Sequence, residues 1–433
     1  MSLIFADIDY LSPDCTVEHG CIGIQGDRVT YIGSQLPENL DDFQEVYDGR
    51  GRLLIPGMYN IHAHAPMTLL RGYAENMVLQ EWLYNKVFPF EGKMTGPDNY
   101  YGSLLAIAEM LRFGVVSYSD MYFETDDRIR AVAESGIKAN VCPALMVFDQ
   151  EVVFSDLEES ITNARYVKEF HNSQAGRIRI DLNIHSEYIS NPQVVRAVGE
   201  QAVELGVGTH IHISETKQEH EDCKDRRGMS PAAYFEGLDF FKAPCTAAHA
   251  VWTEPDDWEV FSRNAVSVAA NPASNLKLAS GFAPIPEMIA AGVNVGIGTD
   301  GMASNNNHNM LQDVYLLATV YKASSDDPTV ISPAQAMQAA TLNGARAQGR
   351  KDCGSIALGN KADLVVMDTD VPWMYPQTSK LNNLVYSALG SDVILTMVDG
   401  EVLYRNGQWQ TIDIERVKHE ALSAVTRIIS GLA

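Results

Sequence analysis

Two histidines lie two residues apart in the stretch PGMYNIHAHAPMTLLRG, which spans residues 56–72 and follows an apolar run. Because side chains at i and i+2 of a β-strand point to the same side, His62 and His64 can direct two imidazoles at one point. Imidazole is a common ligand of divalent metals. The pair alone leaves two interpretations open, since two histidines can also share one strand face without binding anything.

Further residues of the same chemical kinds lie at the ends of candidate strands. THIHISET contains His212 and Glu215, CTAAHAVW contains His249, VNVGIGTDG contains Asp300 and NIHSEY contains His185. Each one alone is more often structural, as a buried histidine bonded to a carbonyl or an aspartate that caps a helix. Their joint placement predicts a functional site, because catalytic residues of barrels gather at the carboxyl ends of the strands.

The elements that must position these residues alternate between strands and helices over residues 57–355. The usual closed arrangement of about 250 such residues is a (β/α)8 barrel. One of its helices is expected after Thr95, with Pro97 in its first turn and Gly114 as its stop. We therefore predict a catalytic (β/α)8 barrel at 57–355.

Both ends of the chain have the pattern of short strands. CIGIQGDRVTYIGS alternates apolar and polar residues around a turn at Gly26 and Asp27, and VILTMVDGEVLYRNGQW repeats the pattern near the other terminus. We predict an α/β protein with a small β-sandwich domain assembled from residues 1–56 and 356–412. A C-terminal helix over 413–433 completes the prediction.

Composition and charge argue against several function classes. The chain has 433 residues and a net charge of −24, which disfavours nucleic acid as a partner. No apolar run approaches the roughly 20 residues of a membrane helix, and the start lacks the pattern of a signal peptide, so we predict no membrane partner and a cytoplasmic location. The six cysteines form no CxxC pair and are expected to be reduced. The basic cluster KDRRG at 224–228 is interpreted as a solvated loop.

Nearly the whole chain resembles the amidohydrolase superfamily, and within it the 5'-methylthioadenosine/S-adenosylhomocysteine deaminases, which are adenosine-type aminohydrolases. The resemblance rests on motifs in the family's order: IPGMYNIHAHAPMTLLRG, EWLYNKVFPFEGKMT, HSEY, HIHISET, NPASNLKLASGFAPI, GTDGMASNNN and GNKADLVVMDTD.

The resemblance implies that four residues hold one divalent metal: His62, His64, His212 and Asp300. Zinc is the most frequent metal in the family, although iron and manganese also suit imidazole and carboxylate ligands. Binuclear relatives bridge two metals with a carboxylated lysine, and no candidate strand here ends in a lysine so placed. His210 shares the strand face of His212, but His212 keeps the family's HxxE spacing to Glu215.

The implied reaction is hydrolytic deamination of an adenosine-type nucleoside to an inosine-type product and ammonia. A bound metal lowers the pKa of water toward about 7, and Asp300 is placed to accept the water's proton. Glu215 is expected to shuttle a proton to the ring nitrogen, while His249 orients the water and stabilises developing charge. The alternative for Glu215 is an exposed carboxylate in the acidic stretch ETKQEHED.

Three residues match the family's substrate-binding positions. Glu91 matches the acceptor of the ribose diol, and Trp82 and His185 match positions that line the nucleoside pocket, although such residues can also serve packing. The segment 140–160 has no arginine or lysine to bind a homocysteine tail, which favours 5'-methylthioadenosine, adenosine or 5'-deoxyadenosine over S-adenosylhomocysteine. Glu187 stands in HSEY where the family usually has proline, and this leaves the role of His185 open.

Two other classes of function fit this sequence less well. A triazine-type hydrolase that displaces chloride or alkylamine, or a deaminase of a free base such as guanine, would have no use for a diol acceptor at Glu91. A structural relative that has lost its metal would lack ligands, yet the proposed ligands are all present. Barrels of this kind are often homo-oligomers, but no stretch identifies an interface.

Overall fold

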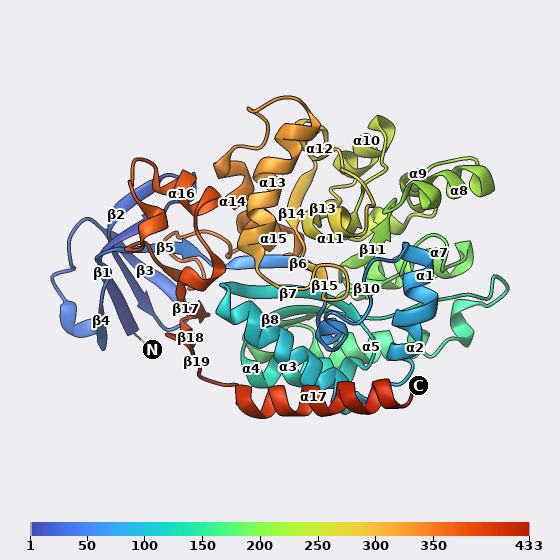
Figure 1. Cartoon of the computed structure of the whole chain (residues 1–433), viewed down its shortest axis with the longest axis horizontal. Coiled ribbons are helices and arrows are strands. Elements are labelled where there is room, and N and C mark those ends of the chain that lie inside the picture. The colour runs from blue at the N-terminus through green and yellow to red at the C-terminus, as the bar shows by residue number, and fades with distance from the viewer. Residues whose placement is uncertain (1, 433) are drawn as a thin grey trace.

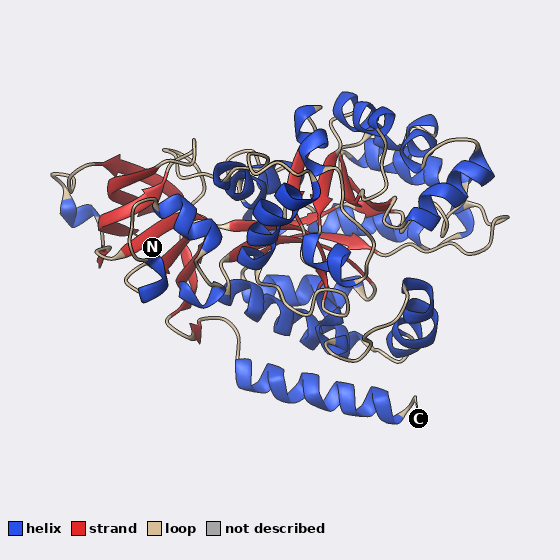
Figure 2. Cartoon of the chain, turned by 45° about the horizontal axis from the view of Figure 1, so that its top comes forward, coloured by secondary structure: helices blue, strands red, loops and turns tan. Residues whose placement is uncertain are grey.

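The computed structural model describes residues 2–432, except the side chains of Leu79 and Gln80. Met1 and Ala433, at the ends of the predicted terminal segments, lie outside the described residues. The molecule is an α/β protein with a mixed sheet at one end and parallel strands surrounded by helices in the rest (Figure 1, Figure 2).

The central strands form two five-stranded sheets in which every neighbouring pair is parallel. The first sheet has the order β15 (Asp300–Gly301), β6 (Met58–His64), β7 (Val115–Tyr122), β8 (Lys138–Pro143) and β9 (Ile178–Ile180). The second has the order β10 (Leu182–Asn183), β11 (Thr209–Ile213), β12 (Cys245–His249), β13 (Ser267–Ala270) and β14 (Asn294–Ile297). Because β10 follows β9 after one residue and β15 follows β14 after two, the chain passes directly between the sheets at both edges.

Most helices lie in sequence between successive central strands, as the predicted alternation requires. They are α1 (Leu79–Trp82), α2 (Phe88–Glu91), α3 (Gly96–Arg112), α4 (Thr125–Ser135), α5 (Glu159–Phe170), α6 (Ser173–Gly176), α7 (Pro192–Leu205), α8 (Lys217–Arg227), α9 (Pro231–Gly237), α10 (Pro255–Arg263), α11 (Pro272–Lys277) and α12 (Ile285–Ala290). Those after the last central strand are α13 (Met310–Ser324), α14 (Pro333–Ala340), α15 (Leu342–Ala347), α16 (Lys380–Tyr386) and α17 (Ile414–Ser430). Helix α3 starts where its signals predict, because the Thr95 N–H donates to the Asp98 carboxylate at 2.7 Å.

Strands from both termini form one mixed sheet at the end of the molecule (Figure 2). Its strands are β1 (Ser2–Leu11), β2 (Val17–Gln25), β3 (Arg28–Gly33), β4 (Glu45–Asp48), β5 (Arg52–Pro56), β16 (Leu364–Asp368), β17 (Val393–Val398), β18 (Glu401–Arg405) and β19 (Gln408–Trp409). The predicted turn at Gly26 and Asp27 joins β2 to β3. We expected a sandwich of two sheets, whereas the strands form one hydrogen-bonded sheet. This sheet forks at β1, because residues 3–6 pair with β4 and Asp9 and Tyr10 pair with β5.

Other expectations from the sequence can be compared with the structure directly. The six cysteines are free and buried. None of the helices in residues 2–432 has the length and apolarity needed to cross a membrane.

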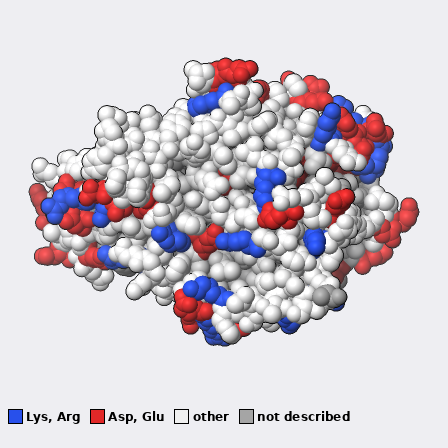
Figure 3. Space-filling view, in the orientation of Figure 1, with Lys and Arg blue, Asp and Glu red and all other residues white. Residues whose placement is uncertain are grey.

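The KDRRG cluster is not the solvated loop that we expected. It forms the last turn of α8 and ends at the left-handed Gly228, and both of its arginines pair with Glu187. Acidic and basic side chains lie side by side over α8 and α9 (Figure 3).

Candidate functional site

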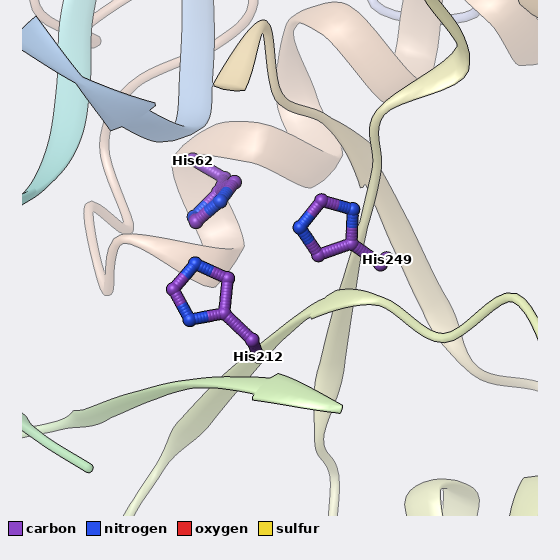
Figure 4. Close-up of side chains that lie close together, drawn as sticks. All are labelled: His62, His212 and His249. Atoms are coloured by element: carbon purple, nitrogen blue, oxygen red, sulfur yellow. The ribbon is translucent and has the colours of Figure 1, made fainter. Parts of the chain in front are cut away.

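The ends of four strands bring histidines and an aspartate to one point. His62 and His64 lie on β6, His212 on β11, His249 at the end of β12 and Asp300 on β15. All are buried except the half-buried His64. Figure 4 shows the rings of His62, His212 and His249 directed toward one another. The sequence-predicted ligands and His249 therefore form one cluster.

The donor atoms of this cluster have the spacing expected of ligands around one ion. His212 Nε2 lies 3.3 Å from His64 Nε2. Asp300 Oδ1 lies 3.4 Å from His62 Nε2 and 3.3 Å from His64 Nε2. Two overlapping sets have ligand atoms within 4.8 Å of one another: His62, His64 and Asp300, and His62, His212 and His249. Zinc bonds of about 2.0–2.2 Å give ligand separations of this order.

Neighbours outside the cluster occupy the Nδ1 atom of three imidazoles, so each Nε2 faces the other donor atoms of the cluster. The Nδ1 atom of His64 lies 2.6 Å from the Met121 carbonyl, and that of His212 lies 2.8 Å from the His185 carbonyl. His62 Nδ1 lies 2.9 Å from His210 Nε2, while the buried Nε2 of His62 has no hydrogen-bond partner. An unpartnered buried lone pair is costly unless something binds it, so these residues fit a metal ion.

The carboxylate of Asp300 is held in place by two hydroxyls. Oδ2 accepts hydrogen bonds from Ser274 Oγ at 2.5 Å and Ser304 Oγ at 2.9 Å, which leaves Oδ1 facing the imidazoles. Burial lowers the pKa of His64, but the hydrogen bond and the charge of Asp300, together with the Met121 carbonyl and the charge of Asp120, outweigh burial and raise that pKa. The carboxylate therefore favours positive charge at this point, as a cation site requires.

Glu215 lies beside the cluster on the turn after β11. Its Oε2 is 3.9 Å from His249 Nε2, and burial raises the pKa of Glu215. Both oxygens of Glu219 hold this turn, since Oε1 accepts from the Ser214 N–H at 3.0 Å and Oε2 from the Glu215 N–H at 2.8 Å. Ser214 has a φ of +48° and His249 a φ of +73°. Such strain is typical of functional sites.

A cleft opens over the cluster, with walls from α1, α2 and the segments that follow β7 and β10. His64, His212, Glu215, His249 and Asp300 line its inner end. The other walls are mainly apolar and include Trp82, Leu83, Val87, Phe88, Phe123, Met146 and Tyr188. Within the described part of the chain, no lysine or arginine lines this cleft.

Glu91 lies in the cleft wall, at the end of a helical segment that runs from α1 through a π-turn at Leu83–Val87 to α2. Its Oε1 accepts a hydrogen bond from the Tyr122 hydroxyl at 2.7 Å. Burial raises the pKa of Glu91 to about 7. Because Tyr122 occupies one oxygen, the other remains available to a ligand.

The structure places the remaining candidate residues differently. Trp82 and His185 line the cleft, with the Trp82 indole donating to the Ala74 carbonyl at 3.2 Å. His210 is outside the lining and contacts the far side of His62. Glu187 is also outside the lining, because its side chain turns toward α8.

Sequence reasoning missed the residues that hold the site from behind: Tyr122, Glu219, Ser274, Asn275 and Ser304. His249 Nδ1, for example, lies 2.9 Å from Asn275 Oδ1. Only Glu219 carries a local signal, since it follows Thr216 at the spacing of a capping box. That spacing predicts the start of α8 but not the contact with the Glu215 amide.

Comparisons with known proteins agree with this geometry. The profile of the Amidohydrolase family matches residues 53–403. A 5-methylthioadenosine/S-adenosylhomocysteine deaminase of Dictyoglomus thermophilum is 39% identical over 422 residues, 97% of this chain and 97% of that protein. A 5'-deoxyadenosine deaminase of Methanosarcina acetivorans is 37% identical over 422 residues, 97% of this chain and 96% of that protein. The crystal structure of an adenosine deaminase from Xanthomonas campestris with bound zinc has a TM-score of 0.92 and 30% identity, and covers 99% of this chain and 98% of that chain.

Proposed function

This chain belongs to the amidohydrolase family, and from this premise we propose that it hydrolyses an adenosine-type nucleoside to the inosine-type product and ammonia. One observation carries the proposal: the candidate metal ligands His64, His212 and Asp300 line the same cleft as the carboxyl groups of Glu215 and Glu91. The substrates named for the similar deaminases support the same reaction.

We assign four residues to one divalent metal, with zinc preferred and iron or manganese as alternatives: His62, His64, His212 and Asp300. When bound, the metal would polarise a water for attack on the purine. The fixed Nδ1 contacts and the free Nε2 of His62 support this assignment. His249 is assigned to orientation of the water, because its Nε2 lies 3.9 Å from Glu215 Oε2.

The proton steps belong to two carboxyl groups. Asp300 Oδ1 faces the imidazole cluster and accepts the proton that the attacking water loses. Glu215 donates a proton to the ring nitrogen that gains electrons when the water oxygen adds to the amino-bearing carbon. Its raised pKa supports this role, because burial favours the protonated form that must donate. Asp300 then passes its proton to the amino group, which leaves as ammonia, while the added hydroxyl returns a proton to Glu215 and becomes the carbonyl of the product.

The substrate we favour is a nucleoside without a charged tail, such as 5'-methylthioadenosine, adenosine or 5'-deoxyadenosine. Glu91 would accept the ribose hydroxyls, and Trp82 and His185 would line the nucleoside. Among the described residues, no lysine or arginine lines the cleft. The carboxylate of a homocysteine tail would therefore be desolvated in the cleft without forming an ion pair, which is unfavourable. S-adenosylhomocysteine is therefore expected to be the poorer substrate.

The architecture we infer places this site in a catalytic domain at 57–355, with 1–56 and 356–412 as a second domain and 413–433 as a helix. The direct chain passages between the two parallel sheets at both edges support closure into a (β/α)8 barrel. The fork at β1 and a separate apolar cluster that includes Phe5, Ile24 and Leu364 support two layers in the terminal sheet.

Ammonia release tests the proposal, with zinc supplied and a panel of 5'-methylthioadenosine, adenosine, 5'-deoxyadenosine, S-adenosylhomocysteine, guanine and a chlorotriazine. We expect turnover of the uncharged nucleosides, slower turnover of S-adenosylhomocysteine, and about one metal per chain. Turnover of guanine or the triazine alone would reject the nucleoside assignment. Preference for S-adenosylhomocysteine would reject the argument from the missing cation.

A further inference from the structure

Two sequence features that the proposed function leaves unused meet in the structure. Glu187 follows His185 in HSEY, and Arg226 and Arg227 belong to the basic cluster KDRRG. Arg226 Nη2 lies 2.5 Å from one Glu187 oxygen, and Arg227 Nε lies 3.0 Å from the other. The three residues form a clamp between the loop after β10 and the end of α8, here called the Glu187 clamp.

The clamp depends on charge because Glu187 has a side-chain exposure of 0%. A buried carboxylate is costly without a partner, and here each oxygen has its own guanidinium. Arg227 is further fixed by Tyr234, whose ring centroid lies 4.9 Å from the guanidinium carbon. The clamp is therefore an anchored contact rather than a mobile surface pair.

One end of the clamp lies in a wall of the cleft. Glu187 is two residues after His185 and directly before Tyr188, and both of these neighbours line the cleft. The carbonyl of His185 also accepts hydrogen bonds from the backbone N–H of His212 at 3.0 Å and from its ring. A shift of this loop would thus move two residues that face the ligand.

The other end is tied to the catalytic turn through α8. This helix carries Glu219 in its first turn, where the carboxylate holds the Ser214 and Glu215 amides, and Arg226 and Arg227 in its last turn. The helix therefore connects the turn that carries Glu215 to the wall that carries His185 and Tyr188.

We propose that Glu187, held by Arg226 and Arg227, is a positioning residue that fixes the His185–Tyr188 wall relative to Glu215 and so determines how tightly the cleft binds its nucleoside. This inference rests on the proposed function. A purely structural clamp would stabilise the fold without affecting nucleoside binding.

The test compares Glu187→Gln and Arg227→Met with wild type in ammonia release from the best nucleoside of the panel. Displacement of a wall by about 1 Å can cost up to 100-fold in rate, so we expect KM to rise about tenfold, with kcat changed less than threefold and zinc content unchanged. Glu236→Gln is the matched control, because Arg263 also binds both oxygens of Glu236, at 2.8 and 2.5 Å, at a more exposed site. Its KM should stay within twofold of wild type.

Three results would overturn the inference: a lower Tm with KM unchanged, a fall in kcat with KM unchanged, or an equal rise of KM in the control. If Glu187→Gln fails to fold, Arg227→Lys takes its place, because lysine keeps the positive charge. This variant should raise KM above wild type by a smaller factor than Arg227→Met. An unchanged KM would reject the proposal. Wild type is measured first. If it deaminates no nucleoside, the proposed function fails and the inference fails with it; an active wild type with unaffected variants rejects the inference alone.

Discussion

Each imidazole at the centre of this molecule has its Nδ1 in contact with a neighbour, so only its Nε2 can bind a ligand. The carbonyls of Met121 and His185 accept from Nδ1 of His64 and His212, so each Nε2 presents a lone pair to the cleft. Burial lowers the pKa of His62 to about 4, which keeps that ring neutral at pH 7. The backbone carbonyls thus determine which nitrogen of each histidine is available to bind a ligand.

Glu215→Gln should separate proton transfer from metal binding. The amide cannot deliver a proton to the ring nitrogen, so turnover should fall by about 10²–10⁴-fold while zinc content stays unchanged. Ammonia release and metal analysis on the same sample measure both. Glu221→Gln is the control, since Glu221 belongs to the same acidic stretch but is 60% exposed and pairs with Lys217 on the surface. Near-normal turnover of Glu215→Gln with metal bound would assign the proton to another group.

Glu91 predicts a pH dependence of nucleoside binding. Burial raises the pKa of Glu91 to about 7, although the Tyr122 hydroxyl lowers it, so the group is protonated below that pH. Only the ionised form can accept both ribose hydroxyls. KM should therefore fall by up to about tenfold per pH unit as pH rises toward 7 and then level off. In Glu91→Gln the KM should be higher and show no such step; the same step in both proteins would place the titrating group elsewhere.

At the scale of elements, the C-terminal helix supports the cleft from behind. Ala421, Ala424 and Ile428 of α17 are buried in one cluster with Trp82 and Phe90, which belong to the helical segment that carries Glu91. Figure 2 shows α17, the helix next to the C-terminus, lying along one side of the molecule. The last helix of the sequence thus stabilises a wall formed by residues 82–91.

Ile428→Ala tests this support. Ile428 is 1% exposed and Leu422, on the same helix, is 69% exposed. Loss of the buried side chain should lower the free energy of unfolding by about 2–5 kcal/mol and raise the nucleoside KM. Leu422→Ala should change stability by no more than about 0.5 kcal/mol and leave KM unaffected. Urea denaturation and steady-state kinetics give both values, and equal effects of the two variants would contradict the packing described.

The sequence predicts elements best where the signal is local. Three features can be recognised from residues that are close together in the sequence: the capping pair at Thr95, the hairpin at Gly26 and the HxH pair. The fork at β1 arises because β4 and β5 pair with different residues along the same strand, which no local pattern of residues indicates. The Glu187 clamp spans about 40 residues between its partners, so neither half indicates the other. Types of residue and their spacing therefore predicted the candidate site, whereas its supporting contacts required the fold.

At the scale of the whole molecule, a buried group of charges joins the terminal sheet to the central strands. Lys138 begins β8, and its Nζ lies 2.5 Å from Asp363 Oδ2 and 2.8 Å from Asp399 Oδ1. Asp363 directly precedes β16 and Asp399 directly follows β17, both in the terminal sheet. Arg177 Nε also binds Asp399, at 3.0 Å, and the Tyr59 hydroxyl donates to Asp363 at 2.5 Å. The two parts of the fold thus share one charge network.

Lys138→Met should weaken this connection. Methionine fills a similar volume but leaves two carboxylates buried with fewer partners, a change that costs about 3–5 kcal/mol, a large fraction of the stability of a typical protein. The control is Lys242→Met, since Lys242 is 65% exposed and pairs with Asp239 at 2.9 Å, and its loss should cost at most about 1 kcal/mol. The network joins the terminal sheet to the strands that carry the proposed metal ligands. Hydrogen exchange of β16 and β17 and zinc release, both followed against urea concentration, should therefore show the terminal sheet separating first in Lys138→Met. Coincident transitions with unchanged midpoints would mean that the network contributes nothing to holding the two parts together.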